Sequence, residues 1–235
     1  MAGSSIAPLF LRLALAATFL WAGFGKILET IPVKGQAAAT LATMGIVTPA
    51  DGKTKDTYNA ADFPDDVRVR QVHGITLMLA TVNKGGGGGA AGEGGAGGGG
   101  ASTMPLVPAV LTEGPWPARL AWASAITELV GGLFVLVGLL TRLAGFSLAC
   151  TMLGAIWLTQ IGPAIQAGRT VLGFIPDHPP YATDAAGSPL FAMLLWQVSL
   201  LCIGLSLTFS GPGALSFDRA LFPGGKGKRA AADED

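Results

Sequence analysis

Four stretches of the chain are apolar enough and long enough to cross a lipid bilayer. A span needs about 20 residues, and an apolar segment of that length must be helical, because only a helix satisfies its own backbone groups in hydrocarbon. The pattern therefore predicts an all-α fold, a polytopic membrane four-helix bundle. The predicted spans run from about Ile6 to Leu28, Leu120 to Leu140, Leu143 to Ile161 and Pro189 to Phe209.

A long connection separates the first predicted span from the second in the sequence, whereas the second and third spans follow one another closely. Because only Thr141 and Arg142 separate the second span from the third, we expect those two spans to form a tight antiparallel hairpin. The expected organisation is a first transmembrane helix in residues 1–29, an extracytoplasmic insert in 30–117, three further transmembrane helices in 118–222 and a cytoplasmic tail in 223–235.

The first span is open to two interpretations, a retained helix or a cleaved secretory signal. A signal needs a basic n-region before its apolar stretch, whereas Arg12 lies inside the stretch. The small residues Ala37, Ala38 and Ala39 resemble a cleavage site but lie far beyond the apolar end. We therefore favour the retained helix.

Basic residues near the span ends predict the orientation. Arg142 lies in the hairpin turn, and four more basic residues follow the fourth span, at 219, 226, 228 and 229. By the positive-inside rule these ends are cytoplasmic. With four spans, both termini then lie in the cytoplasm of a multi-pass protein of the cell (inner or plasma) membrane.

The insert has three parts. Residues 36–47 are expected to form a short amphipathic helix. Residues 64–84 begin with Pro64 and two aspartates, which suit a helix N-terminus. This segment ends in an apolar run too short to span, which predicts a helix lying on the membrane or packing on the bundle. Residues 85–100 contain 12 glycines and are expected to be a flexible tether that reaches roughly 22 Å.

Composition narrows the function classes. Half of the 235 residues are hydrophobic and only 13% are charged, which is roughly half the charge of a soluble domain. The formal net charge of zero provides no basic excess for nucleic acid, so no nucleic-acid partner is expected. The glycine tract lacks the flanking strand, helix and lysine of a phosphate-binding loop. No metal-binding spacing is present either, so we expect a membrane protein without a metal site.

Three motifs in the spans resemble the DoxX family of small four-helix membrane proteins. The resemblance covers the first span and residues 118–222, whereas the connection at 50–115 is longer than is typical of the family. It implies the four-helix fold and, because the family is named after a subunit associated with a thiosulfate:quinone oxidoreductase, a role beside quinone-linked redox chemistry. The motifs are Leu11–Leu15 with Phe19–Ile27, Glu128–Leu133 with Val137–Arg142, and Ser210–Asp218.

Ionisable residues inside the spans are the candidate functional residues, because a charge at the centre of a span costs roughly 2.5–3.5 kcal/mol. Arg12 and Lys26 are 14 residues apart and share a face of the first helix, as Glu128 and Arg142 do on the second. Because the two helices are antiparallel, Lys26 and Glu128 are expected in the outer half. Arg12 and Arg142 are expected near the inner side. We predict that Lys26 reaches Glu128, and the four residues are candidates for an intramembrane polar cluster. The alternative is that the basic side chains snorkel to the interfaces.

Other residues have more ordinary interpretations. Gly131 and Gly132 are expected to allow close helix packing. A C-terminal motif is expected to end the fourth helix and begin a short interfacial helix; it comprises Gly211, Pro212, Gly213 and Asp218. Cys150 and Cys202 lie at matching depths, so they are either a redox pair or two inert residues. His73 and His178 fall on the outer side, where solvated histidines are common.

Three functions follow from these residues. The first is an accessory subunit of a quinone-linked membrane redox process, with quinone as the candidate ligand and a redox protein as partner. The second is a non-catalytic membrane scaffold that recruits an extracytoplasmic partner through the insert. The third, less favoured, is a small-solute or proton pathway built on Glu128. The sequence identifies no catalytic residue and leaves open whether the protein is an enzyme.

Overall fold

The computed structural model describes residues 6–48, 58–84, 105–177, 183, 189–211, 213 and 216–218. Within these residues, four helical stretches are long and apolar enough to cross a membrane, which confirms the predicted polytopic fold. The spans are α1 (Ala7–Leu28), α5 (Trp116–Val137), a continuous run of α6 (Thr141–Ile156), the π-helix η4 (Trp157–Ile161) and α7 (Gly162–Gln166), and α8 (Leu190–Ser210).

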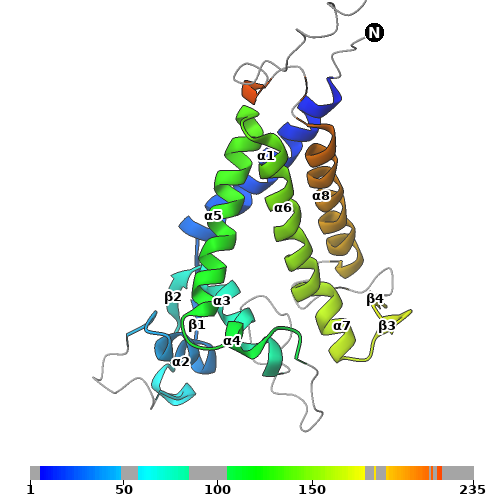
Figure 1. Cartoon of the computed structure of the whole chain (residues 1–235). Helices are drawn as coiled ribbons and strands as arrows, with labels where there is room; N and C mark the ends of the chain where they lie inside the picture. Colours follow the sequence, from blue (N-terminus) through cyan, green and yellow to red (C-terminus); the bar gives the residue numbers. More distant parts are fainter. Residues whose placement is uncertain are drawn as a thin grey trace, which may run out of the picture.

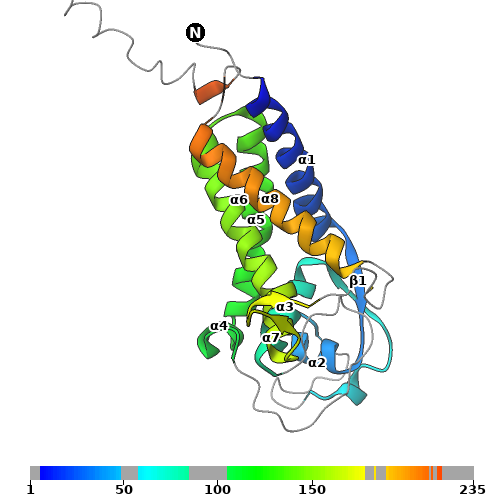
Figure 2. The same ribbon diagram turned by 90° about the vertical axis from the view of Figure 1, so that its right-hand side faces the viewer.

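The spans are arranged as two close pairs, α1 with α5 and α6 with α8 (Figures 1 and 2). Small residues permit both approaches: a Cβ at Gly23 of α1 would lie 3.1 Å from the Leu129 backbone nitrogen, and one at Gly145 of α6 would lie 3.0 Å from the Gly204 carbonyl oxygen of α8. The α5–α6 hairpin joins the pairs at one end, as predicted. Figure 1 shows that α5 and α6 diverge away from this hairpin.

The bundle core occupies the half of the bundle next to the hairpin, which we call the inner half. The start of α1 and the end of α8 lie at the same end (Figure 2). There α1 packs its buried face against α5 and α8, and all four spans contribute to one core. The buried core residues are Leu15, Ala16, Phe19, Val135, Ala144, Leu148, Leu200 and Leu207.

An outer module with its own core lies at the opposite end. Its strands β1 (Thr30–Val33) and β2 (Val67–Arg70) pair antiparallel, with Val33 opposite Val67. The helix α2 (Gly35–Thr43) and the 3-10 turn η2 (Ala60–Asp62) pack beside them. The expected helix in 36–47 is thus present, although it ends at Thr43.

The expectation of a helix beginning near Pro64 is wrong, because residues 67–70 form β2. The physical reason is the alternation of valine and arginine in this segment, which buries Val69 and exposes Arg68 and Arg70. The helix α3 (Val72–Thr81) begins only after the strand. It packs on α5, where Val72 contacts Ala121 and Ala125, so the expected packing on the bundle is confirmed.

The described residues on either side of positions 85–104 are hydrogen-bonded to one another. Asn83, in the 3-10 turn η3 (Val82–Lys84), accepts hydrogen bonds from the Leu106 and Val107 backbone N–H groups at 2.9 and 3.2 Å, and its amide donates to the Val107 carbonyl at 2.7 Å. The predicted tether at 85–100 lies outside the described residues. The outer module is instead joined directly to α5 through α3.

Two short elements complete the outer end. The helix α4 (Ala109–Thr112) precedes α5, and the strands β3 (Thr170–Val171) and β4 (Ile175–Pro176) form a small antiparallel hairpin after α7.

Candidate functional site

Lys26 and Glu128 form an ion pair inside the bundle, as the sequence predicts. The Lys26 Nζ atom lies 2.5 Å from Glu128 Oε1 and 2.6 Å from Oε2. The Glu128 side chain is 1% exposed and the Lys26 side chain is 24% exposed. Ser124, one turn before Glu128 on α5, donates from Oγ to Oε1 at 3.4 Å. These three residues are called the ion-pair group below.

Glycines bring α1 and α5 close enough for this contact. A Cβ at Gly132 would lie 3.2 Å from the Leu20 side chain of α1, and a Cβ at Gly131 would lie 3.0 Å from Leu148 of α6. Gly131 and Gly132 therefore pack against two different helices. Their small size places the end of α1 beside the middle of α5, where Lys26 reaches the carboxylate.

The ion-pair group has a definite chemical capacity. A buried carboxylate in a span needs a compensating charge, and Lys26 supplies it together with a hydrogen bond to each oxygen. An ammonium group has three donors, and Glu128 takes two of them. The group thus presents an ammonium, held by a buried carboxylate, that can donate to an oxygen atom of a ligand.

Arg12 occupies a separate place at the inner end of the bundle. It is 2% exposed, and its guanidinium donates to the Val135 and Leu136 carbonyl oxygens, both at 2.9 Å. These carbonyls belong to the last turn of α5. Arg12 therefore stabilises the C-terminus of a helix, as a cation does there.

Asp218 completes the same end of the molecule. Its carboxylate accepts hydrogen bonds from the backbone N–H groups of Leu140 at 2.6 Å and Thr141 at 2.9 Å, so it caps the start of α6. Leu140 has a φ of 48°, a strained conformation that this contact holds in place. Asp218 thus joins the segment that follows the fourth span to the α5–α6 turn.

The structure separates the four predicted charges into these two places. Arg142 is exposed and lies beside Gly211, where a Cβ would be 3.1 Å from its Nε atom. Gly211 follows the last residue of α8, with a φ of 78°. Gly213 is described and also has a positive φ, whereas Pro212 and His178 lie outside the described residues.

The two cysteines lie on the outside of the α6–α8 pair. Cys150 and Cys202 are both free and exposed. The described part of the chain contains no group of three or more His, Cys, Asp or Glu residues that would hold a metal ion.

Sequence reasoning missed three polar residues of the spans. Gln197 of α8 donates from Nε2 to Thr159 Oγ1 of η4 at 3.2 Å, and Gln160 is 5% exposed. The signal that identifies them is the one used for the charges, namely a polar side chain in an otherwise apolar span. Ser124 carries the same signal and was also missed, although it lies only four residues before Glu128.

His73 lies outside the spans, on α3, in a partly buried position. Its ring packs edge-on against Trp122 at a centroid distance of 6.3 Å, and Arg70 lies 6.0 Å from the same Trp122 ring. Burial, and secondly the charge of Arg70, lower the pKa of His73 below its ordinary value of 6.5. The neutral imidazole is therefore the form that the fold favours.

This pKa shift predicts a loss of stability in acid. Between the lowered pKa of His73 and about 6.5, the unfolded chain binds a proton that the folded chain does not, so stability falls as the pH drops through that interval. Thermal unfolding in detergent at pH 7.5 and 5.5 checks this. His73→Gln is expected to reduce the pH dependence, and an equal drop in both proteins contradicts the assignment.

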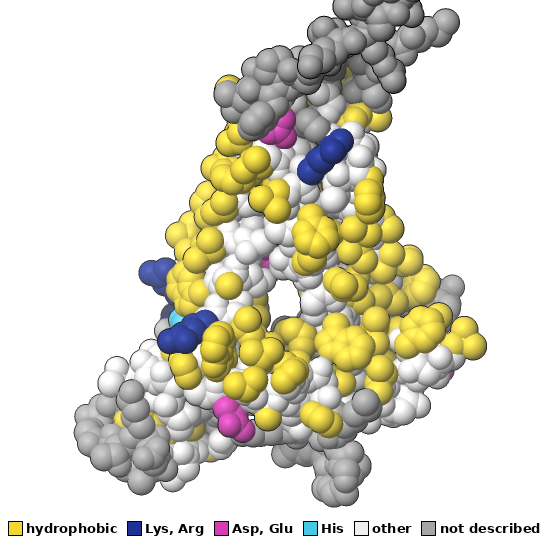
Figure 3. All heavy atoms as spheres, in the orientation of Figure 1, with side chains coloured by type: hydrophobic (Ala, Val, Ile, Leu, Met, Phe, Trp, Pro, Cys, Tyr) yellow, Lys and Arg dark blue, Asp and Glu magenta, His cyan; other side chains and the backbone are white. Residues whose placement is uncertain are grey.

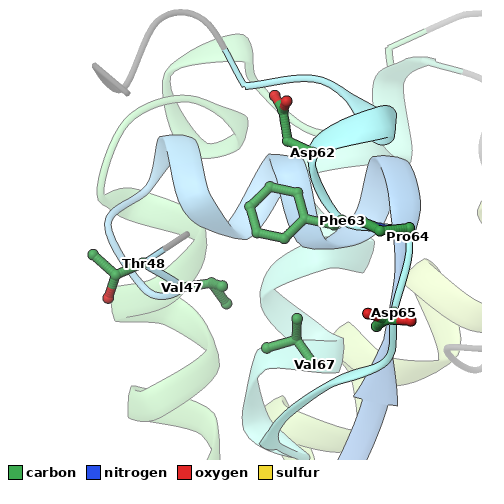
Figure 4. Close-up of a pocket in the computed structure, with 7 residues that line it drawn as sticks. All are labelled: Val47, Thr48, Asp62, Phe63, Pro64, Asp65 and Val67. Carbon is green, nitrogen blue, oxygen red and sulfur yellow. The ribbon is translucent and has the colours of Figure 1, made fainter. Parts of the chain in front are cut away.

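A pocket of about 200 Å³ lies in the outer module, between the end of α2 and the segment before β2 (Figure 4). Val47, Phe63 and Val67 give it apolar walls, and Asp62 and Asp65 add two carboxylates. Asp62 Oδ2 accepts from the Asn59 backbone N–H at 2.9 Å, so this carboxylate also caps η2. The pocket lies outside the spans and apart from the ion-pair group.

The spans and the buried ion pair define a multi-pass helical membrane protein. Residues 68–161 match the family model described as DoxX, which confirms the resemblance drawn from the sequence. The match begins in β2 and includes α3, so it starts inside the connection that we expected to depart from the family pattern. It contains Glu128, Gly131, Gly132 and Arg142. The chain is thus a multi-pass membrane protein whose residues 68–161 are similar to the DoxX family.

One curated relative supports the same class. An uncharacterized membrane protein of Mycobacterium tuberculosis is 38% identical over 107 residues, which is 46% of this chain and 55% of the relative. The chain therefore spans about half the length of the curated relative that it matches. No solved structure matches the chain significantly.

Proposed function

We propose that the chain is an accessory membrane subunit of a quinone-linked redox process. The observation that carries the proposal is the Lys26–Glu128 ion pair, a costly group in a span that a purely structural bundle does not need. The DoxX match adds the association of the family name with quinone reduction. In this proposal the protein lies in the cell membrane with both termini in the cytoplasm, on the side of Arg142.

The ion-pair group fits a quinone chemically. A bound quinone supplies electron transfer coupled to proton uptake, and its carbonyl oxygens accept hydrogen bonds. The Lys26 ammonium has a third N–H that Glu128 does not use, and its side chain is 24% exposed. Glu128 holds the ammonium in position, and Ser124 orients the carboxylate.

Purification of the full chain in mild detergent, followed by identification of bound quinone and protein partners, tests the proposal. We expect quinone and a redox protein to copurify with the wild-type protein. Lys26→Met combined with Glu128→Met leaves no unpaired charge in the span. This double variant is expected to lower the quinone content about tenfold, because one charged hydrogen bond is worth about 1.5–3 kcal/mol. Lys26→Arg keeps the charge and is expected to keep the bound quinone. Lys34→Met, at an exposed position of the outer module, is the matched control and is also expected to keep it. Equal quinone content in all four proteins contradicts the proposal.

The outer module favours a second function, recruitment of an extracytoplasmic partner. It has its own core, and its pocket joins apolar walls to two carboxylates. Replacing residues 34–66 by a two-residue turn removes α2 and the pocket, while the pairing of Val33 with Val67 is kept. A pull-down with this variant that returns an unchanged list of partners counts against the scaffold.

A further inference from the structure

The outer halves of α5 and α6 enclose an open space. In the inner half, Gly131 of α5 packs on Leu148 of α6, and both residues are buried. Further out the two helices diverge, and Figure 3 shows an opening through the molecule between them. We call this space the chamber. Because it lies between membrane spans and opens laterally, its surroundings are bilayer lipid.

Hydrogen bonds close the far end of the chamber. Trp157 Nε1 donates to the Leu106 carbonyl at 3.0 Å, and Gln166 Nε2 donates to the Val82 carbonyl at 3.1 Å. Leu148 and Trp157 are nine residues apart, which corresponds to about 14 Å along α6. The chamber is therefore bounded at both ends, with a height suited to a ring or a small head group.

The walls that face each other across the chamber carry hydroxyl groups. At 100° per residue, Ser124 lies about 20° and Thr127 about 40° from the direction of Gly131 on α5. On α6 and η4, Thr159 lies about 20° from the direction of Leu148 by the same count, before the small correction for the π-turn. All three side chains are half-buried, whereas the inner halves of the same faces are buried. Half-buried hydroxyl side chains on two facing helices indicate that the space between the helices is open and lined by polar groups.

Two carboxamides on the α6–α8 side have acceptor atoms without a donor. Gln197 Oε1 and Gln160 Oε1 are buried, and nothing in the described part of the chain donates a hydrogen bond to either. Gln160 lies in the π-helix η4, and π-turns often occur at functional sites. An unpaired amide in an apolar medium costs about 1–3 kcal/mol. Gln197, which bonds Thr159, is the carboxamide that a ligand in the chamber would reach. Gln160 lies about 120° from the direction of Leu148 by the same count, so we do not assign it to the chamber.

We propose that the chamber binds the head group of a lipid-soluble ligand through hydrogen-bonding oxygen atoms. Ser124 connects one wall to the Lys26–Glu128 pair, which offers a cationic donor and a carboxylate acceptor. The opposite wall offers the Thr159 hydroxyl and the Gln197 amide. A quinone ring and a glycerolipid head group both have this chemistry. The site rests on the lining of the chamber, and its assignment to a quinone rests on the proposed function.

Photo-crosslinking of the full chain in nanodiscs tests the site. One probe is a short-tailed benzoquinone with a photoreactive group, and the other is a photoreactive phosphatidylcholine. We expect labelling of residues 124–127 and 151–159 that saturates and is displaced by unlabelled short-tailed benzoquinone. The double substitution Thr159→Val with Gln197→Leu is expected to raise the half-saturating concentration about five- to tenfold.

Matched controls lie on the same two helices. Ser147→Ala and Ser199→Ala remove hydroxyls that bond only their own helix, to the Leu143 and Leu195 carbonyls among others. They are expected to leave labelling unchanged. Peptide mapping on the wild-type protein gives the location even if the double variant fails to fold.

The outcomes separate the two proposals. Displaceable labelling of the chamber by the quinone probe supports both. Displaceable labelling of the chamber by the phosphatidylcholine probe alone supports the site and contradicts the quinone-linked function. Labelling by the quinone probe that saturates elsewhere overturns the chamber and leaves the proposed function standing. The absence of any saturable labelling in 124–127 and 151–159 overturns the chamber as a binding site.

Discussion

Lys26→Met is expected to lower the free energy of unfolding of the bundle by about 3–5 kcal/mol, because it leaves an uncompensated carboxylate in a span. Glu128 is 1% exposed, and Lys26 is its ion-pair partner in the described structure. The remaining contact, from Ser124 at 3.4 Å, is long for a hydrogen bond to a carboxylate. The loss is measured by titration of the detergent-solubilised protein with a denaturing detergent.

The double variant Lys26→Met with Glu128→Met distinguishes the effect of an unpaired charge from the effect of changed side-chain packing. Replacement of a buried ion pair by apolar side chains of similar volume is often neutral or stabilising, so we expect the double variant to regain most of the lost stability. Charge reversal by Glu128→Lys is expected to prevent folding, because it places two ammonium groups together. A stable Glu128→Lys protein, or a double variant whose loss is the sum of the two single losses, contradicts the pairing role.

The spans, the hairpin and the ion pair were predictable because the membrane restricts the alternatives. A run of apolar residues must be helical there, and a very short link between two spans forces an antiparallel pair. The link was predicted at 141–142 and lies at 138–140, because α6 already begins at Thr141. Charges are so rare in such segments that Lys26 and Glu128 stand out. Their distances from the span ends then place them at compatible depths on antiparallel helices.

The strands β1 and β2 were missed because the period-2 signal of four residues is weak. Their partners are separated by residues 34–66, and no local pattern indicates which segments pair. The alternation in Val67–Arg70 is visible in the sequence, but two aspartates next to it also suit a helix start. Here the non-local pairing, rather than the local preference, decides the structure.

The separation of the four charges into two places was also predictable. A spacing of 14 residues puts Arg12 on the face of Lys26, but along the helix it separates them by about 21 Å. What the spacing could not indicate is that Arg12 bonds the last turn of α5. The chamber, by contrast, was not predictable from the sequence. It depends on how far α5 and α6 diverge after Gly131, which is set by the contacts of α3 and Leu106 with the outer ends of the two helices.

Gly138→Ala is expected to destabilise the inner end of the bundle by about 3 kcal/mol or more. Gly138 has a φ of 76°, and an alanine in this left-handed region costs about 1–2 kcal/mol. The added Cβ would also overlap the Arg12 guanidinium, lying 2.7 Å from Cζ, and would lie 2.8 Å from Ser216 Cβ. Arg12 would have to leave the Val135 and Leu136 carbonyls, each contact being a hydrogen bond of a charged donor.

Gly154→Ala is the matched control for this substitution. Gly154 lies within α6, and a Cβ there meets no atom within 4 Å, so alanine is expected to be neutral or to stabilise the helix by about 0.5–1 kcal/mol. The two variants are compared by the same denaturing-detergent titration and by limited proteolysis of the α5–α6 turn. Because Asp218 also bonds Gly138, Leu140 and Thr141, we expect the turn of Gly138→Ala to be cleaved faster. Equal stability and equal cleavage of the two variants would show that the Arg12–Asp218 contacts do not hold this end together.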